Sequence, residues 1–317
     1  MSTPPRRVIL LGPQRATPIV DAAVESLRLD PKARIVAVTA GWEEREPEDL
    51  ELGEHLGGRV VNLGIYSRGD DVYRRDPELH QALRERHDKL RRLQDLYRLR
   101  LAHALEAARE LLRLDGDPAL LGPERTAAIE AVRMLDQQHL EQQKAIHAEY
   151  VDRWHPDDRD AVVEHRHQLA KILDDTGLLC VAGGHVGILV NRVRLFDLMS
   201  LLGDRPVIGW SAGAMALTQR IVLFHDHPPQ GAGDAEVFGP ALGICDGIVP
   251  LPHASQRLQL DDPTRVSIFA RRFQPDLAVA LDARCRVDRD GEVWCGQPGT
   301  RQLAVSGELL EVGGPAC

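Results

Sequence analysis

Val207-Ile-Gly-Trp-Ser-Ala-Gly-Ala-Met215 is the stretch that decides the fold of this chain. A short β-type run leads into Ser211, small residues flank the serine, and apolar residues at helical spacing (Ala214, Leu217, Ile221) follow it. Gly-x-Ser-x-Gly on a strand-to-helix turn is the layout of a nucleophile elbow, which forces the serine into strained backbone geometry and requires small neighbours. The positive end of the following helix helps to stabilise an oxyanion. We therefore expect Ser211 to be a nucleophile.

Composition limits the classes of protein to consider. The chain has 317 residues, a net charge of −9 and 43% hydrophobic residues, which suits a soluble globular protein with a sizeable core. The acidic balance argues against a nucleic-acid binder, which needs a basic face. No apolar run is long enough to span a bilayer. Arg6 and Arg7 precede a strand-like run at once and do not begin a signal peptide, so we expect a cytoplasmic protein without a membrane partner.

Neither a metal nor a cofactor is expected. The five cysteines are scattered without a Cys-x-x-Cys pair, so no disulfide framework or zinc site is predicted. His225-Asp-His227 could ligate a metal from an extended strand, but no third ligand has a recognisable spacing, and a solvated loop is expected. Gly12-Pro13 and Gly183-Gly184 fall short of a dinucleotide-binding fingerprint.

Strand and helix signals alternate at both ends of the chain. Residues 1–76 and 177–317 are predicted to be the two parts of one α/β domain, with a mostly parallel sheet sandwiched by helices. The expected strands are 8–11, 34–39, 59–63, 178–181, 207–208, 248–249 and 277–281. A hairpin with Asp290-Gly291 at its turn is predicted over 286–293.

The middle segment, 77–176, is expected to be an all-helical insertion. Leucines recur at spacings of three, four and seven from Pro77 onward, and no strand signal interrupts them. Asp115-Gly-Asp-Pro118 breaks the pattern, a second helix is predicted from Pro123 to Trp154, and Pro156 opens a third. The charged residues suit the solvated face of a helical hairpin or small bundle; a homodimer contact or a cap over the site is the alternative.

His253 and Asp282 are the candidates for the base and the acid that a serine nucleophile needs. Each follows a strand-like run, where it would face a site at the carboxyl edge of a parallel sheet. The alternatives are a loop histidine and an ordinary acidic strand terminator.

Gly183-Gly184 follows a buried strand and precedes a helix. Backbone N–H groups there could complete an oxyanion hole beside the N–H of Ala212; a plain strand-to-helix turn is the alternative. An α/β-hydrolase runs in the order serine, acid, histidine, whereas here the best histidine precedes the best acid. The chain order therefore disfavours an esterase of that type.

These residues together resemble the peptidase E and cyanophycinase family of serine peptidases, whose fold is like that of class-I glutamine amidotransferases. The similar stretches are Leu178–Val186, with its Gly-Gly turn, Ile208–Ala214, with the serine, Leu242–His253 and Leu277–Val287. The family's acid stands in an Asp-Glu-Gly or Pro-Glu-Gly context, whereas here Ala283 occupies the glutamate position next to Asp282.

The resemblance implies acyl transfer to water through an acyl-enzyme on Ser211, with His253 as base and Asp282 as acid. Gly184 and Ala212 would donate the oxyanion hydrogen bonds. The implied substrate is a small peptide or amide whose scissile bond lies beside an acidic residue. The weaker candidates for substrate contact are Gly183, His185, Trp210 and Arg284, with Arg257 and Arg286 as further carboxylate-binding candidates.

A hypothesis of another class competes with the hydrolase. A catalytically silent binding or scaffold protein on the same fold would use the helical insertion as its partner surface. It predicts an unreactive Ser211, whereas the hydrolase predicts a reactive one.

Overall fold

A mixed seven-stranded sheet forms the centre of the molecule, whose computed structural model describes residues 6–224 and 234–313. Its order is β11-β10-β1-β5-β4-β2-β3, and the five strands from β1 to β3 in that order are mutually parallel. The antiparallel pair β10–β11 completes one edge, as the predicted hairpin requires. The strands are β1 (Val8–Leu11), β2 (Arg34–Val38), β3 (Val60–Asn62), β4 (Thr176–Val181), β5 (Val207–Trp210), β10 (Arg286–Asp290) and β11 (Val293–Gly296). The predicted α/β class with a mostly parallel sheet is confirmed.

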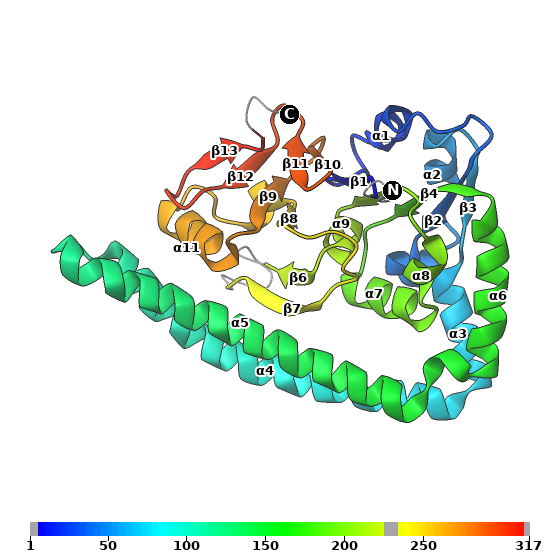
Figure 1. Cartoon of the computed structure of the whole chain (residues 1–317), viewed down its shortest axis with the longest axis horizontal. Helices are drawn as coiled ribbons and strands as arrows, with labels where there is room; N and C mark the ends of the chain where they lie inside the picture. Colours follow the sequence, from blue (N-terminus) through cyan, green and yellow to red (C-terminus); the bar gives the residue numbers. More distant parts are fainter. Residues whose placement is uncertain (1–5, 225–233, 314–317) are drawn as a thin grey trace.

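Helices cover both faces of this sheet because its parallel strands are apolar on both sides. Alternate residues along β1 point to different cores: Val8 and Leu10 to one, Ile9 and Leu11 to the other. The second core is closed by α1 (Val20–Ser26) and α2 (Leu50–His55). The first is closed by α3 (Ile65–Arg75), α6 (Asp160–Asp174), α7 (Val186–Leu195) and α8 (Leu198–Leu202). Figure 1 shows α1 and α2 on one side of the sheet and α7 and α8 on the other.

A second sheet lies beside the first and carries the strands that precede the expected base and acid. Its order is β13-β12-β9-β8, with β8 and β9 parallel. The strands are β8 (Ile248–Pro252), β9 (Leu277–Leu281), β12 (Arg301–Leu303) and β13 (Leu309–Glu311), and α11 (Pro263–Phe273) packs on them. The carboxyl edge that holds His253 is therefore the edge of this smaller sheet rather than of the central one.

The helix after Ser211 is shorter than its apolar spacing predicts. It ends at Leu217, and Ile221 lies in β6 (Arg220–Leu223), which pairs with β7 (Glu236–Pro240). Thr218 stops the helix because its backbone turns extended. Its hydroxyl lies 2.9 Å from the carbonyl oxygens of both Met215 and Arg220 and donates its single proton to one of them at a time. The expectation that Ile221 continues the helix is wrong.

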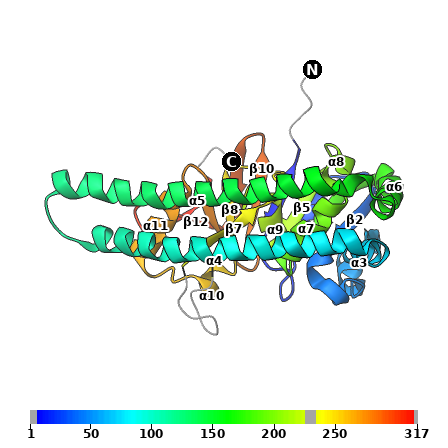
Figure 2. The ribbon, with the colours of Figure 1, turned by 90° about the horizontal axis from the view of Figure 1, so that it is seen from below.

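Two 37-residue helices, α4 (Pro77–Arg113) and α5 (Pro118–Trp154), form an antiparallel hairpin along one side of the molecule. They lie side by side over their whole length (Figure 2), which confirms the predicted long helical insertion. The start expected at Pro123 is wrong. Asp117 caps the N-terminus by accepting from the N–H of Ala119, and Pro118 fits the first turn, so Pro123 lies inside the helix.

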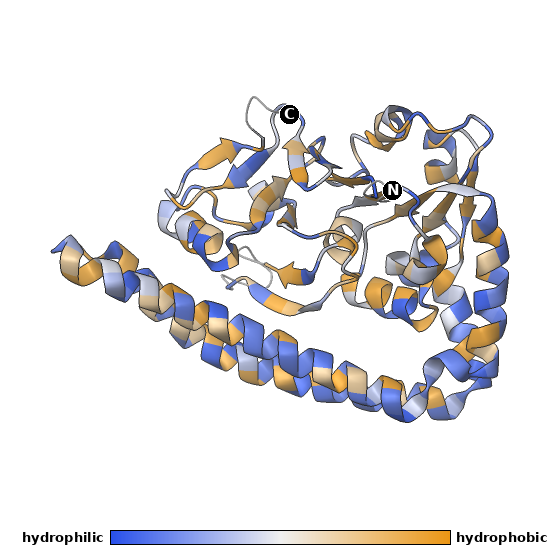
Figure 3. Ribbon diagram, viewed as in Figure 1, coloured by the Kyte–Doolittle hydropathy of each residue, from blue (hydrophilic) through white to orange (hydrophobic). Residues whose placement is uncertain are grey.

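The hairpin packs on the body through both of its helices, since α4 contacts α3, α11 and β7. α5 contacts β7 and α11, whereas α6 packs on α3 and α8, away from the hairpin's long axis. In Figure 3 the central strands are largely orange, and hydrophilic blue prevails along the hairpin. No helix in the described ranges combines the length and the apolar run needed to cross a bilayer.

The cysteines differ in state. Cys180 and Cys245 are buried and free, and Cys285 is free and half-buried. Cys295 is disulfide-bonded, although the scattered cysteines predicted no disulfide framework. His225-Asp-His227 lies outside the described residues.

Candidate active site

Ser211 joins β5 to α9 (Ala212–Leu217) in a conformation with φ 52° and ψ −123°. Its N–H donates to the carbonyl of Leu11 at 3.1 Å, which fixes the turn against β1. A Cβ at Gly213 would lie 2.1 Å from the carbonyl oxygen of Val181, so only glycine fits there. The serine is half-buried and therefore reachable from solvent. This geometry matches the strained elbow expected from the motif.

The Gly183-Gly184 turn after β4 packs directly against the serine. A Cβ at Gly183 would lie 3.0 Å from the Cβ and 3.3 Å from the Oγ of Ser211. Gly184 has φ 106°, and a Cβ there would lie 2.1 Å from the carbonyl oxygen of Gly41. Within the described residues, the N–H groups of Gly184 and Ala212 make no hydrogen bond. Both are thus free to donate to an oxyanion.

His253 and Asp282 lie at the ends of neighbouring parallel strands. Pro252 of β8 is in register with Leu281 of β9, and the N–H of His253 donates to the Leu281 carbonyl at 3.3 Å. His253 adopts a left-handed conformation (φ 59°, ψ 33°) and begins the short helix α10 (Ala254–Arg257). The carboxylate of Asp282 accepts from the N–H of Ser255 at 3.1 Å. The strand pairing thus places the backbones of His253 and Asp282 next to each other.

The end of β1 links this pair to the serine. Gly12 lies against Asp282, since a Cβ at Gly12 would be 1.9 Å from the Asp282 carbonyl oxygen. The N–H of Gly12 donates to the carbonyl oxygen of Cys285 at 2.9 Å. Leu11, the preceding residue, accepts the hydrogen bond from Ser211, and α9 packs on β8. In the described residues the Oγ of Ser211 makes no hydrogen bond. Catalytic hydrogen bonds are commonly long in ligand-free enzymes and tighten only with substrate.

The electrostatics of His253 favour its neutral form. Burial lowers the pKa of His253 below its usual 6.5, and the positive charge of Arg257 lowers it further. Asp282 and a hydrogen bond with Gln256 act in the opposite direction. The net shift is downward, so the imidazole is neutral at pH 7 and can accept a proton.

The weaker candidates for substrate contact have different environments. His185 is exposed, and its Nδ1 caps α7 by accepting from the N–H of Ile188 at 3.2 Å. Trp210 is 6% exposed and belongs to the core under α1 and α2. Arg284 is exposed with φ 68°. Arg286 is bound to Asp288.

The sequence alone did not predict that Gly41 supports the site. Gly41, in the short helical segment η1 (Ala40–Arg45) after β2, accepts from the N–H of His185 at 2.7 Å and supports the Gly183-Gly184 turn. A Cβ at Gly41 would lie 2.5 Å from the carbonyl oxygen of Gly183. A glycine closely following a buried strand is a signal for such a close approach.

Comparisons with known proteins include a distant likeness to a solved structure. No family model matches the chain, and no curated protein matches it. A solved structure described as the crystal structure of a peptidase from an acI-B1 Actinobacterium is similar in part: it is 16% identical and covers 56% of this chain and 76% of that one, with a TM-score of 0.33.

Proposed function

We propose that the chain is a serine-type peptidase or amidohydrolase of the peptidase E and cyanophycinase type, on a class-I glutamine amidotransferase-like fold. The observation that carries the proposal is the backbone of Ser211. A serine with positive φ between a buried strand and a helix is costly to maintain, and such strain concentrates at functional sites. The elbow orients the hydroxyl while the helix N–H groups remain free.

The proposed reaction proceeds in two steps. His253 takes the proton of Ser211 as the Oγ attacks the carbonyl carbon, and the oxyanion accepts hydrogen bonds from the N–H groups of Gly184 and Ala212. His253 then protonates the leaving amine, and an acyl-enzyme forms. In the second step His253 takes a proton from water as the water oxygen attacks the acyl ester. His253 then returns the proton to the Oγ of Ser211, and the carboxylic acid product is released. Asp282 stabilises the imidazolium from the neighbouring strand end.

The proposed substrate is a small peptide or amide with a negative charge next to the scissile bond. Arg257 is exposed four residues after His253 and acts on it electrostatically, and Arg284 is exposed two residues after Asp282. A guanidinium binds a carboxylate through two hydrogen bonds, so either side chain suits an acidic substrate.

Labelling with a fluorophosphonate probe tests the activated serine. We expect the wild-type chain to be labelled, and Ser211→Ala and His253→Ala to lose labelling while keeping the wild-type circular dichroism spectrum. Ser255→Ala is the matched control, because the backbone N–H of Ser255 and not its hydroxyl contacts Asp282. A screen of acidic dipeptides and isoaspartyl amides then identifies the substrate.

The competing hypothesis is a silent binding protein, which is supported by the lack of a hydrogen bond on the Ser211 hydroxyl within the described residues. It predicts a folded wild-type chain that the probe does not label. It also predicts that a partner is lost when the hairpin is removed. The first result would count against the hydrolase.

A further inference from the structure

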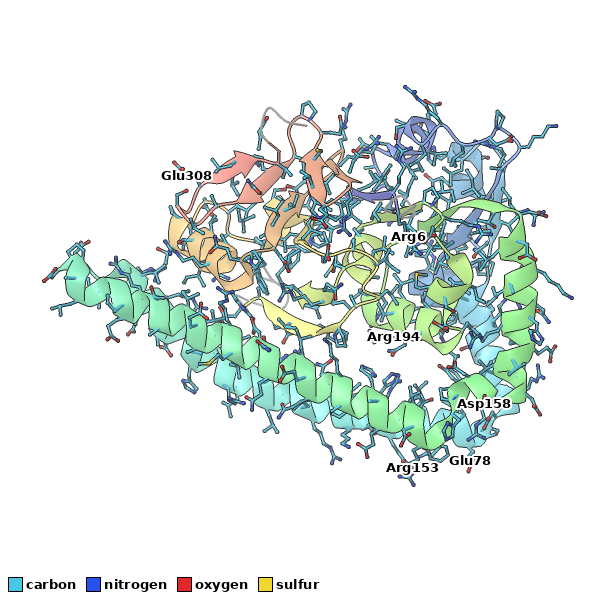
Figure 4. The ribbon with its side chains drawn as sticks, viewed as in Figure 1. Arg6, Glu78, Arg153, Asp158, Arg194 and Glu308 are labelled. Atoms are coloured by element: carbon cyan, nitrogen blue, oxygen red, sulfur yellow. The ribbon has the colours of Figure 1, made fainter. Side chains whose placement is uncertain are left out.

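A cavity lies away from the serine, between the helical hairpin and the body. It has a volume of about 320 Å³ and is lined by residues of α3, α4, α5 and α7, by Pro156 and by the end of β7. Polar side chains reach it from four helices. They are Tyr73 from α3, Arg86 from α4, Lys144, His147 and Tyr150 from α5, and Asn191 and Arg194 from α7. Figure 4 labels Arg194 on the side of α7 that faces the hairpin. The volume falls in the range of small-molecule sites.

The charges around this cavity have one sign. Of the described residues that line it, none is an aspartate or a glutamate, and they include two arginines and a lysine. Within the described residues, neither Arg86 nor Arg194 has a carboxylate partner. Arg194 donates instead to the backbone carbonyls of Pro240 and Ala241 at 2.9 and 2.8 Å.

Arg86 is satisfied only in part. Its Nη2 donates to Asn191 at 3.0 Å and has a longer contact of 3.4 Å with the ring of His87. Its guanidinium also lies over the ring of Tyr150, 4.4 Å from the centroid. Its Nε is buried and has no hydrogen-bond partner in the described part of the chain. The Arg86 side chain is half-buried, and its buried Nε donor costs stability unless a ligand accepts its hydrogen bond.

The cationic groups also act on one another. Burial and the charge of Arg86 lower the pKa of Arg194 to about 10. Burial, Arg86 and Arg194 together lower the pKa of His147 to about 3, so that His147 is neutral and adds no further positive charge. A bound anion would relieve this repulsion.

We propose that this cavity binds a small organic dianion, either a phosphate monoester or a dicarboxylate, with Arg86 and Arg194 as its charged ligands. Two guanidinium groups match two negative charges, and Arg forms paired hydrogen bonds with carboxylate and phosphate alike. Lys144 is exposed on the lining and attracts the ligand from solvent. The apolar side chains of Leu83 and Leu195 give the organic part a contact surface. The ligand would bridge the hairpin and the body, and this proposal does not depend on the activity of Ser211.

Thermal melting and calorimetric titration of the full chain test the proposal. The probes are inorganic phosphate, glycerol phosphate and succinate, with sodium chloride at matched ionic strength as reference. We expect at least one dianion to raise the melting temperature by about 5 °C at a concentration 100-fold above its dissociation constant. Glycerol phosphate and succinate separate the phosphate and carboxylate sources, and a shift with either supports the proposal.

Variants locate the bound anion. Arg86→Met and Arg194→Met should each weaken binding at least tenfold. Lys144→Met should weaken it several-fold. Because Lys144 is exposed, this third variant should fold and so tests the proposal even if an arginine variant does not fold. Arg92→Met is the matched control, since Arg92 is exposed on the same helix outside the cavity. Absence of any shift with all three dianions, or equal binding by wild type and the three cavity variants, would overturn the proposal.

Discussion

Ser211 and the glycines around it carry the local argument for function. A positive φ at a serine persists only where the surroundings impose it, and here Gly213 and Gly183 leave room for the turn while the hydrogen bond to Leu11 holds it. The same close approaches make the glycines sensitive to substitution. Substitution of Gly213 tests the packing around Ser211, and the pH dependence tests the role of His253.

Gly213→Ala should destabilise the protein by about 1–3 kcal/mol, because the new methyl would lie 2.1 Å from the Val181 carbonyl oxygen. Gly53→Ala is the control: nothing lies within 4 Å of its Cβ position in α2, so we expect a gain of about 0.5–1 kcal/mol. Urea unfolding measures both. Equal stability of the two variants would contradict the packing argument.

The pH dependence of kcat/KM should report the ionisation of His253. Because its pKa is lowered from 6.5, activity should fall as the pH drops through a value below 6.5 and the imidazole becomes protonated. Arg257→Gln removes a charge that lowers this pKa, so the acid limb should move to higher pH.

Asp282→Asn should move the acid limb the other way. Asp282 raises the pKa of His253, and its neutralisation lowers that pKa further while reducing kcat by orders of magnitude. The pH profiles of kcat/KM for Arg257→Gln and Asp282→Asn, measured with the substrate that the screen identifies, test both expected shifts. Shifts in the same direction would exclude His253 as the titrating group.

At the scale of elements, a buried ion pair joins α5 to α11. Arg272 donates to both carboxylate oxygens of Asp136, at 2.6 and 2.8 Å, and the Tyr97 hydroxyl donates to the same carboxylate at 2.7 Å. The Arg272 and Asp136 side chains are 2% and 6% exposed. The pair links one helix of the insertion to the body through charge rather than through apolar contact alone.

Asp136→Asn should lower the free energy of unfolding by about 3–5 kcal/mol, because it leaves the buried Arg272 without its counter-charge. The double variant Asp136→Leu/Arg272→Met should recover much of the loss. Glu48→Gln, which breaks the exposed pair with Arg45, should change nothing measurable. Chemical denaturation compares the three; a neutral Asp136→Asn would show that the pair does not hold the hairpin.

At the scale of the whole molecule, the hairpin is held by a polar network that acid should weaken. His139 is 2% exposed, and its Nε2 lies 2.8 Å from the Gln94 oxygen. Burial lowers the pKa of His139 to about 4, against the opposing charges of Asp136 and Glu236. The folded protein therefore binds the proton less readily than the unfolded chain.

Stability should accordingly fall as the pH drops from 6.5 towards 4, by about 3 kcal/mol from His139 alone. Above pH 6.5 both states leave this histidine neutral and its contribution to the pH dependence vanishes. His139→Gln should make the dependence shallower, whereas His103→Gln, on an exposed part of α4, should not. Unfolding at a series of pH values measures the slope, and identical slopes for wild type and His139→Gln would refute the assignment.

A homodimer through the insertion stays a prediction at this scale. Leu96 and Leu99 on α4 are each 62% exposed, so the hairpin keeps apolar side chains that the body does not cover. Light scattering of the full chain gives its mass in solution. A monomeric mass at high protein concentration would contradict the dimer.

Local patterns in the sequence determined much of this protein. The alternating strand and helix signals predicted the α/β class, leucine spacing predicted the long insertion, and the motif around Ser211 predicted an elbow whose backbone strain the structure bears out. Each of these depends on residues within one turn or one strand. Periodicity and small neighbours suffice there, because the forces involved are steric and short in range.

Only the tertiary structure decided what lies far apart in sequence. β8 and β9 pair in a sheet separate from the central one, and this pairing sets the backbone of His253 beside that of Asp282. Arg86 and Arg194 meet at one cavity although 108 positions (194 minus 86) separate them. Strand partners and helix docking are selected by the packing of whole faces and by the burial of charge, and those energies exist only when the chain is folded.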